Sequence, residues 1–186
     1  MTTLVFCLEE ESAKFLLEGI LPRILQPQID IRFLVFEGKQ DLQSQLGRRL
    51  KGWLAPDTHF VVLHDQDSGD CVTLKARLKD ICNEAGKPTA MVRIACHELE
   101  SFYLGDLGAV ERALQVSGLA RQQGSRKFRD PDALNNAAQE LKKISGKKYQ
   151  KLSGSRLISL EMALDGTNKS TSFNQLCAGI RRLIAA

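Results

Sequence analysis

The chain has 186 residues, of which 43% are hydrophobic and 26% are charged, and its formal net charge is +4. These values are ordinary for a globular protein, and the length fits one domain with a sizeable core. No apolar run approaches the roughly 20 residues of a membrane span, and the N-terminus lacks a basic segment followed by an apolar one. We therefore expect no membrane association and a cytoplasmic location.

The cysteines indicate a reducing compartment. Their number is odd and no two form a Cys-x-x-Cys pair, which argues against a disulfide framework or a thiolate zinc site. We expect all five to be structural: Cys7, Cys71, Cys82, Cys96 and Cys177.

Charge divides the chain into two parts. Residues 1–106 contain 12 lysine and arginine residues against 16 acidic ones, whereas residues 107–186 contain 14 against 6. We expect an α/β core over 1–106 and a basic helical extension over 107–186 within the same globular unit. The basic part is either a solvated face or a surface that meets phosphates.

Apolar segments alternate with helical patterns throughout the first part. Strands are expected at 4–8, 31–36, 60–63 and 91–96, and helices at 12–26, 41–53, 70–85 and 101–104. This order predicts a doubly wound, mainly parallel four-stranded sheet with right-handed crossovers. The second part has no strand pattern; its helices are expected at 108–116, 133–144, 156–164 and 172–184, with basic loops at 117–132 and 145–154.

The segment around the third expected strand carries the clearest chemical signal. Four apolar residues are followed by His64, Asp65, Gln66 and Asp67, then by a Ser-Gly turn. If the backbone stays extended, Asp65 and Asp67 point the same way at the carboxyl edge of the sheet. Two such anions repel each other unless a cation or proton lies between them. The segment is therefore either a divalent-metal site or a turn whose aspartates cap the next helix.

Two other strands also end in acids. Glu9 follows the first strand, and Glu98 and Glu100 follow the fourth. Capping explains one such end more easily than three that meet at one edge. An oxygen-only set suits Mg²⁺ or Mn²⁺, which can activate a water for an in-line phosphoryl displacement.

Other nucleotide and phosphate chemistries fit less well. A P-loop at Gly38-Lys39 lacks the earlier glycine and the following hydroxyl residue. Lys39 is then either a residue that contacts an anion near a helix N-terminus or, as we expect, a solvated turn residue. The three histidines lack the spacing of zinc ligands. A phosphatase or a phosphoacceptor domain would place its acids differently along the strands.

The arrangement of acids resembles that of Toprim domains, which occur in topoisomerases, primases and the overcoming-lysogenisation-defect nucleases. It resembles further a small bacterial family of Toprim-like proteins, often encoded beside an ABC-type ATPase in defence loci. The segments that carry the likeness are Leu-Glu-Glu-Glu-Ser at 8–12, Phe-Glu-Gly-Lys-Gln-Asp-Leu at 36–42, Asp-Gln-Asp at 65–67, Glu-Leu-Glu-Ser-Phe-Tyr-Leu-Gly-Asp at 98–106 and Lys-Tyr-Gln-Lys at 148–151.

The resemblance implies roles for individual residues. Glu9 matches the Toprim glutamate, a general acid/base or metal ligand, and Asp65 and Asp67 match the metal aspartates. Glu100 matches the later acid, and Lys151 a basic residue that stabilises the phosphoryl group. One departure is Glu10, which stands where these nucleases commonly have glycine.

Together these features predict a Mg²⁺- or Mn²⁺-dependent nuclease acting on DNA or RNA, as effector of an ATPase-linked anti-phage system. The alternative is a non-catalytic binding or regulatory subunit that partners an ATPase; homo-oligomerisation is left open. Phe128 and Tyr149 are expected either to stack on bases or, more simply, to pack within their loops. The candidates for phosphate contact are Arg126, Lys127, Arg129, Lys142, Lys143, Lys147, Lys148 and Lys151.

Overall fold

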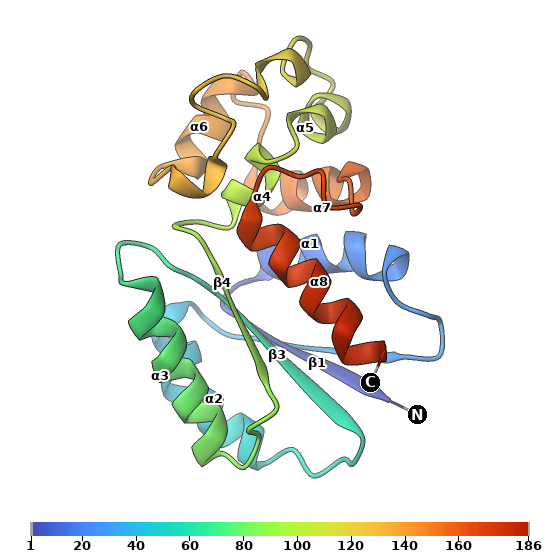
Figure 1. Cartoon of the computed structure of the whole chain (residues 1–186), viewed down its shortest axis with the longest axis vertical. Coiled ribbons are helices and arrows are strands. Elements are labelled where there is room, and N and C mark those ends of the chain that lie inside the picture. Colours follow the sequence, from blue (N-terminus) through green and yellow to red (C-terminus); the bar gives the residue numbers. More distant parts are fainter. Residues whose placement is uncertain (1, 186) are drawn as a thin grey trace.

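A computed structural model describes residues 2–185 and shows an α/β fold built on one parallel sheet (Figure 1). The strand order is β2-β1-β3-β4, and every neighbouring pair is parallel. The predicted fold class is thus confirmed, with a sheet that is wholly parallel. The strands are β1 (Thr3–Leu8), β2 (Asp30–Val35), β3 (Thr58–Asp65) and β4 (Met91–Ala95).

The strand order creates a switch point between β1 and β3. From β1 the chain moves outward to β2, and from β3 it moves outward in the opposite direction to β4. In open α/β sheets, ligands bind beyond the carboxyl ends of the strands at such a point. Leu8 is in register with Leu63, so Glu9 follows β1 at the same height as the end of β3.

Helices cover both faces of the sheet, because successive strand residues point to opposite sides and both sets are apolar. One set, with Phe6 and Val61, packs beneath α1 (Glu11–Ile20) and α8 (Thr171–Ala185). The other set, with Val5 and Val62, packs beneath α2 (Lys39–Lys51) and α3 (Cys71–Glu84).

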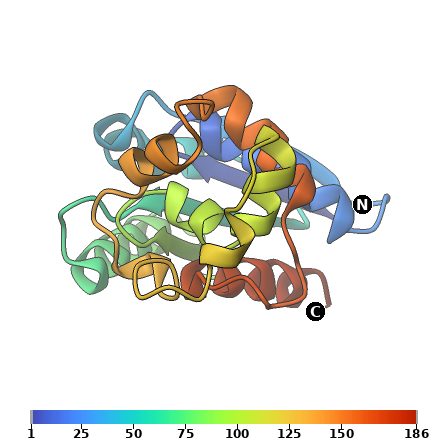
Figure 2. The same ribbon diagram turned by 90° about the horizontal axis from the view of Figure 1, so that it is seen from above.

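Most of the second part, residues 107–170, lies beyond the carboxyl ends of the strands, whereas α8 lies along a face of the sheet, as Figure 1 shows from the side and Figure 2 from above. Helix α7 (Lys151–Glu161) packs along α1, and α8 contacts β4. A Cβ at Gly19 of α1 would collide with Ser159 of α7, so this close approach needs glycine. The remaining elements are α4 (Glu100–Leu104), α5 (Leu107–Leu114), α6 (Ala137–Ile144), α7 (Lys151–Glu161) and 3-10 turns at Leu21–Arg23, Ala120–Gln122 and Pro131–Ala133.

Several expected helix boundaries were wrong, and one expected loop is anchored to the rest of the protein. Helix α1 ends at Ile20, because Pro22 lacks an N–H and the chain continues as a 3-10 turn. Helix α7 begins at Lys151, inside the segment expected to be a basic loop. The loop at 117–132 is anchored by buried Phe128 and by Gln123, whose side chain hydrogen-bonds three backbone groups.

Both parts of the chain contribute to one hydrophobic cluster, in which Phe6, Phe102 and Phe173 are fully buried. Across residues 2–185, the structure contains no helix with the length and apolarity needed to cross a membrane.

Candidate active site

A cleft of about 400 Å³ lies beyond the carboxyl ends of the strands. Helix α6 and the start of α7 cover it and form its roof. The cleft brings together acids from three strand ends and a lysine from the start of α7. All of the acids that the sequence analysis singled out line the cleft: Glu9, Asp65, Asp67, Glu98 and Glu100. Lys151, the basic residue that the resemblance assigned to phosphate stabilisation, lines it too. The lining also includes Glu10, Lys142 and Tyr149.

Glu9 and Asp65 form the centre of the cleft, at the switch point of the sheet. The Glu9 carboxylate accepts a hydrogen bond from the Asp65 backbone N–H through Oε2, at 3.2 Å. Asp65 in turn accepts from the Leu99 N–H through Oδ2, at 3.1 Å. The ends of β1, β3 and β4 are therefore joined by the acids themselves.

The turn after β3 differs from the extended strand that the spacing of the two aspartates suggested. Asp67 has φ +53° and, beside it, His97 after β4 has φ +58°, a conformation uncommon for residues other than glycine. The two turns hold each other, since the Asp67 N–H donates to the His97 carbonyl at 2.7 Å. Strained backbone of this kind tends to occur at functional sites.

The acids after β4 have different partners from one another. Glu98 accepts a hydrogen bond from the Ala138 N–H at 2.8 Å, and so caps the first turn of α6. Glu100 is 3% exposed and accepts from the Tyr149 hydroxyl at 2.9 Å. Tyr149 is itself buried beside Tyr103 in the main hydrophobic cluster, so its ring packs in the core and not only within its own loop, and base stacking by this ring is not available.

Burial raises the pKa of the central carboxyl groups. For Asp65, desolvation is the largest cause and the neighbouring charge of Glu9 is the second, and its pKa lies well above the usual range. The pKa of Glu9 is raised by burial, with the nearby His64 acting in the opposite direction. Burial likewise raises the pKa of Glu100, against the hydrogen bond from Tyr149. A cation bound among these carboxylates would offset both their desolvation and their mutual repulsion.

Comparison with known proteins yields one relationship. A family model described as a domain of unknown function, DUF4276, matches residues 8–181. The chain belongs to this family. The match spans every residue of the cleft, from Glu9 to Lys151, and its description names no activity. No curated protein and no solved structure matches the chain.

The acids of this DUF4276 domain fit Mg²⁺ or Mn²⁺ by donor type, since both ions prefer carboxylate oxygen. Glu9, Asp65 and Asp67 are each anchored through one oxygen, and hydrogen bonds between residues 2–185 leave the second oxygen of each uncommitted. Metal-ligating carboxylates are commonly anchored in this way. As they stand, no three acidic, histidine or cysteine side chains in this range converge closely enough to hold an ion. Binding would therefore require these side chains to turn toward one another.

Two ion pairs in the cleft were not expected from the sequence. Lys39, predicted to be a solvated turn residue, lies 2.8 Å from the Asp67 carboxylate, although its side chain is 53% exposed. Lys151 lies 2.6 Å from Glu10, the residue that departs from the Toprim pattern. The sequence feature that could have indicated the Lys39 ion pair is the position of this lysine at the start of a helix, next to the segment that follows β1.

His64, which lacks the spacing of a zinc ligand, has a structural role. Its ring is 2% exposed, and Nδ1 lies 3.3 Å from Glu9 Oε2. Gln43 of α2 lies 3.1 Å from Nε2 through its amide nitrogen, which is a donor, so the ring proton resides on Nδ1. The acceptor for that proton is the Asp65 carbonyl, 2.5 Å from Nδ1. His64 thus ties the end of β3 to α2 and lies beside the Glu9 carboxylate.

The candidate phosphate-binding cations differ in whether they already have a partner. Lys127 is paired with Glu140 at 2.5 Å, and Lys148 donates to the Gln115 carbonyl at 2.8 Å. Within residues 2–185, no ion pair or hydrogen bond engages the charged groups of the exposed residues Arg126, Arg129, Lys142, Lys143 and Lys147. Phe128 is buried and belongs to the main hydrophobic cluster.

Proposed function

We propose that this DUF4276 domain is a Mg²⁺- or Mn²⁺-dependent phosphodiesterase that cuts nucleic acid. One observation carries the proposal: acids from three separate strand ends line a single cleft at the switch point of the sheet, together with Lys151. A structural network would satisfy these acids with cations, yet Glu9 and Asp65 have backbone donors and a histidine as their partners.

The roles follow from the contacts. Glu9 and Asp65, with Asp67, would hold the metal, which when bound supplies an activated water and neutralises charge on the phosphate. Hydrolysis adds the water oxygen to phosphorus and breaks one P–O ester bond, and the departing oxygen takes a proton. Lys151 is placed at the rim of the cleft, where its ammonium can shift from Glu10 to the phosphate and stabilise the extra charge of the transition state.

The second candidate is a non-catalytic binding or regulatory subunit. It is favoured by the ion pairs Lys39–Asp67 and Lys151–Glu10, which already neutralise two of the acids. Under this alternative the cleft would bind a phosphate-bearing partner or a structural ion without cutting.

A nuclease assay distinguishes the two candidates. The full chain is incubated with single-stranded DNA, plasmid DNA and RNA, in Mn²⁺, Mg²⁺ or EDTA. We expect cleavage that needs metal and is lost in Asp65→Asn and Glu9→Gln. Glu84→Gln, which removes an exposed acid at the far end of α3, is the matched control and should cut normally. Equal cutting by Asp65→Asn and the unmodified chain would refute the proposal.

Three further expectations stay predictions: an ABC-type ATPase partner, a role in anti-phage defence and a cytoplasmic location. All five cysteines are free, as a reducing compartment requires. Co-purification with an ATPase encoded beside the gene would test the partner.

A further inference from the structure

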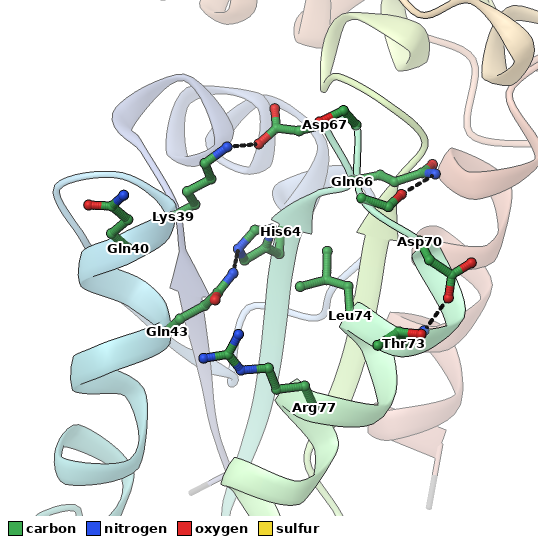
Figure 3. A pocket seen from close by; sticks show the side chains of 12 residues that line it. Lys39, Gln40, Gln43, His64, Gln66, Asp67, Asp70, Thr73, Leu74 and Arg77 are labelled. Atoms are coloured by element: carbon green, nitrogen blue, oxygen red, sulfur yellow. Dashed lines mark hydrogen bonds and ion pairs between the residues drawn. The ribbon is translucent and has the colours of Figure 1, made fainter.

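A second hollow, of about 430 Å³, lies between α2 and α3 next to the acid cleft (Figure 3). Asp67 lines both cavities, so the hollow and the cleft meet at the turn after β3. Its size is that of sites for single small organic ligands. Of its lining residues, the chemistry proposed above uses only Asp67.

The hollow contains a cation that has no partner among residues 2–185. Arg77 extends from α3 with its guanidinium directed toward Gln43 (Figure 3), and no ion pair or hydrogen bond within that range engages it. The two acids in the lining are committed elsewhere. Asp67 is paired with Lys39, and Asp70 accepts a hydrogen bond from the Thr73 N–H at 2.7 Å as the cap of α3. The charge of Arg77 is therefore available to an anion.

The start of α2 adds further anion-binding groups on the opposite wall. Gly38 precedes the helix with φ +95°, and no side chain caps the first turn. Backbone N–H groups at such an end bind anions, and the helix dipole favours negative charge there. Lys39 is the first residue of this helix, and its exposed ammonium can reach either Asp67 or a ligand in the hollow.

The rest of the lining suits a planar, hydrogen-bonding group. Leu74 projects from α3 and gives the hollow an apolar wall, while Gln43 of α2 contributes an amide on the opposite side (Figure 3). Amide side chains both donate and accept, which matches the edge of a nucleobase. Buried His64 closes the floor and holds Gln43 in place.

We infer that this hollow is a nucleotide subsite. Arg77 binds the phosphate, and the base lies against Leu74 within reach of the Gln43 amide, while Lys39 and the start of α2 lie at the other end of the hollow, next to the acid cleft (Figure 3). The inference rests on the proposed function, because the ligand is the nucleotide of the substrate strand that adjoins the phosphodiester in the acid cleft. Lys39, paired with Asp67, stands at the junction of the two cavities.

Calorimetry in EDTA tests the subsite without any cleavage. The full chain is titrated with adenosine monophosphate, adenosine and inorganic phosphate. We expect the monophosphate to bind and adenosine to bind at least about tenfold more weakly, since it lacks the charged hydrogen-bond partner. Arg77→Ala should weaken monophosphate binding by about tenfold or more on the same grounds.

Two control variants locate the binding. Lys75→Ala removes a charge from the same helix outside the hollow and should leave the affinity for adenosine monophosphate unchanged. Asp65→Asn alters only the acid cleft and should retain the binding. Absence of binding at millimolar monophosphate, or equal affinity in Arg77→Ala, would overturn the assignment.

Kinetics then links the subsite to the substrate strand. With an oligonucleotide and Mn²⁺, Arg77→Ala should raise KM by about tenfold and change kcat little, because it removes binding that ground state and transition state share. An unchanged KM would refute the substrate assignment. Failure of the nuclease proposal is recognised separately, since it would appear as cleavage that survives Asp65→Asn, whereas the EDTA titration depends on no cleavage.

Discussion

The ammonium of Lys151 lies 2.6 Å from the carboxylate of Glu10 and so joins the first turn of α7 to the segment that follows β1. The two residues are 141 positions apart in the sequence. Glu10 is also the acceptor for the Ser12 hydroxyl at 2.8 Å. The residue that departs from the Toprim pattern thus holds the lysine that the same pattern assigns to phosphate stabilisation.

Replacement of Lys151 tests its role in transition-state stabilisation. Lys151→Ala should lower kcat by about 100-fold or more, the usual cost of removing one preorganised donor. The pair is half-exposed, so the free energy of unfolding should change by about 1 kcal/mol at most. Lys169→Ala, which removes an exposed charge outside the cleft, is the control for net charge. Unchanged kcat in Lys151→Ala, measured by single-turnover cleavage, would remove Lys151 from the mechanism.

Replacement of Glu10 should have the opposite effect on substrate binding. Glu10→Gln keeps the side-chain size and the acceptor for Ser12 but releases the Lys151 ammonium. We expect a lower KM for an oligonucleotide, because Lys151 no longer has to leave an ion pair and a negative charge has gone from the cleft. A KM that rises in Glu10→Gln would mean that Glu10 contacts the substrate or metal directly.

Asp65 should make stability fall as pH rises. Its pKa is raised well above the unfolded value, so the folded chain keeps a proton that the unfolded chain has lost. The free energy of unfolding therefore decreases between the ordinary aspartate pKa of about 4 and the raised folded value, and is constant above it. Asp65→Asn removes the titrating group, so this decrease in unfolding free energy is absent in the variant. Its amide oxygen can still accept the hydrogen bond from the Leu99 N–H.

Denaturant unfolding in EDTA at several pH values measures the effect. The variant should gain stability over the unmodified chain as pH rises from about 4 toward neutral, and the gain should vanish near the ordinary aspartate pKa of about 4. If the difference in unfolding free energy between Asp65→Asn and the unmodified chain were independent of pH, Asp65 would not have a raised pKa in the folded chain.

Added metal should reverse the cost of burying these acids. Binding to the folded chain raises the free energy of unfolding by about 2.7 kcal/mol when the free ion is at about 100 times its Kd. Thermal unfolding should therefore shift upward with Mn²⁺ or Mg²⁺ in the unmodified chain and stay constant in Asp65→Asn. A shift of equal size in both proteins would place the ion outside the cleft.

The sequence was informative about the strands and the acids for a common physical reason. Buried parallel strands are continuous apolar runs, and an abrupt change to carboxylates marks where each strand leaves the core. Since parallel strands end at one edge, Glu9, Asp65 and Glu100 could be placed together without knowledge of any side-chain contact.

The partners of these acids could not be predicted, because each is set by tertiary packing between distant segments. Glu98 caps a helix 40 residues later in the chain, where no local pattern marks the pairing. Tyr149 lies in an expected basic loop, yet its ring is buried and its hydroxyl reaches Glu100, 49 residues earlier in the chain. The ion pair between Lys39 and Asp67 depends on the left-handed backbone conformation of Asp67, because that turn sets the direction of its carboxylate. The spacing of the two aspartates in the sequence does not reveal this conformation.

The Tyr149–Glu100 contact provides a test of the roof over the cleft. Tyr149→Phe leaves a buried carboxylate without its hydroxyl donor, at a cost of about 1–3 kcal/mol in unfolding free energy at neutral pH. Glu100→Gln and the double variant complete a thermodynamic cycle that isolates the pair. A coupling energy near zero would mean that the hydrogen bond contributes no stability.

The salt dependence of nucleic-acid binding tests the exposed cations at the edge of the roof. Arg126, Arg129 and Lys147 are exposed and unpaired within residues 2–185, so each is free to replace a counterion on a phosphate. The combined variant Arg126→Gln, Arg129→Gln, Lys147→Asn uses asparagine at the last position because φ there is +66°. Its slope of log K against log salt should decrease by about 0.7–0.9 for each phosphate that the variant no longer neutralises. Lys127→Gln is the matched control. The Lys127 ammonium is already paired with Glu140, so its removal should change the slope less. An unchanged slope in the triple variant, measured by fluorescence anisotropy, would identify these residues as a solvated face.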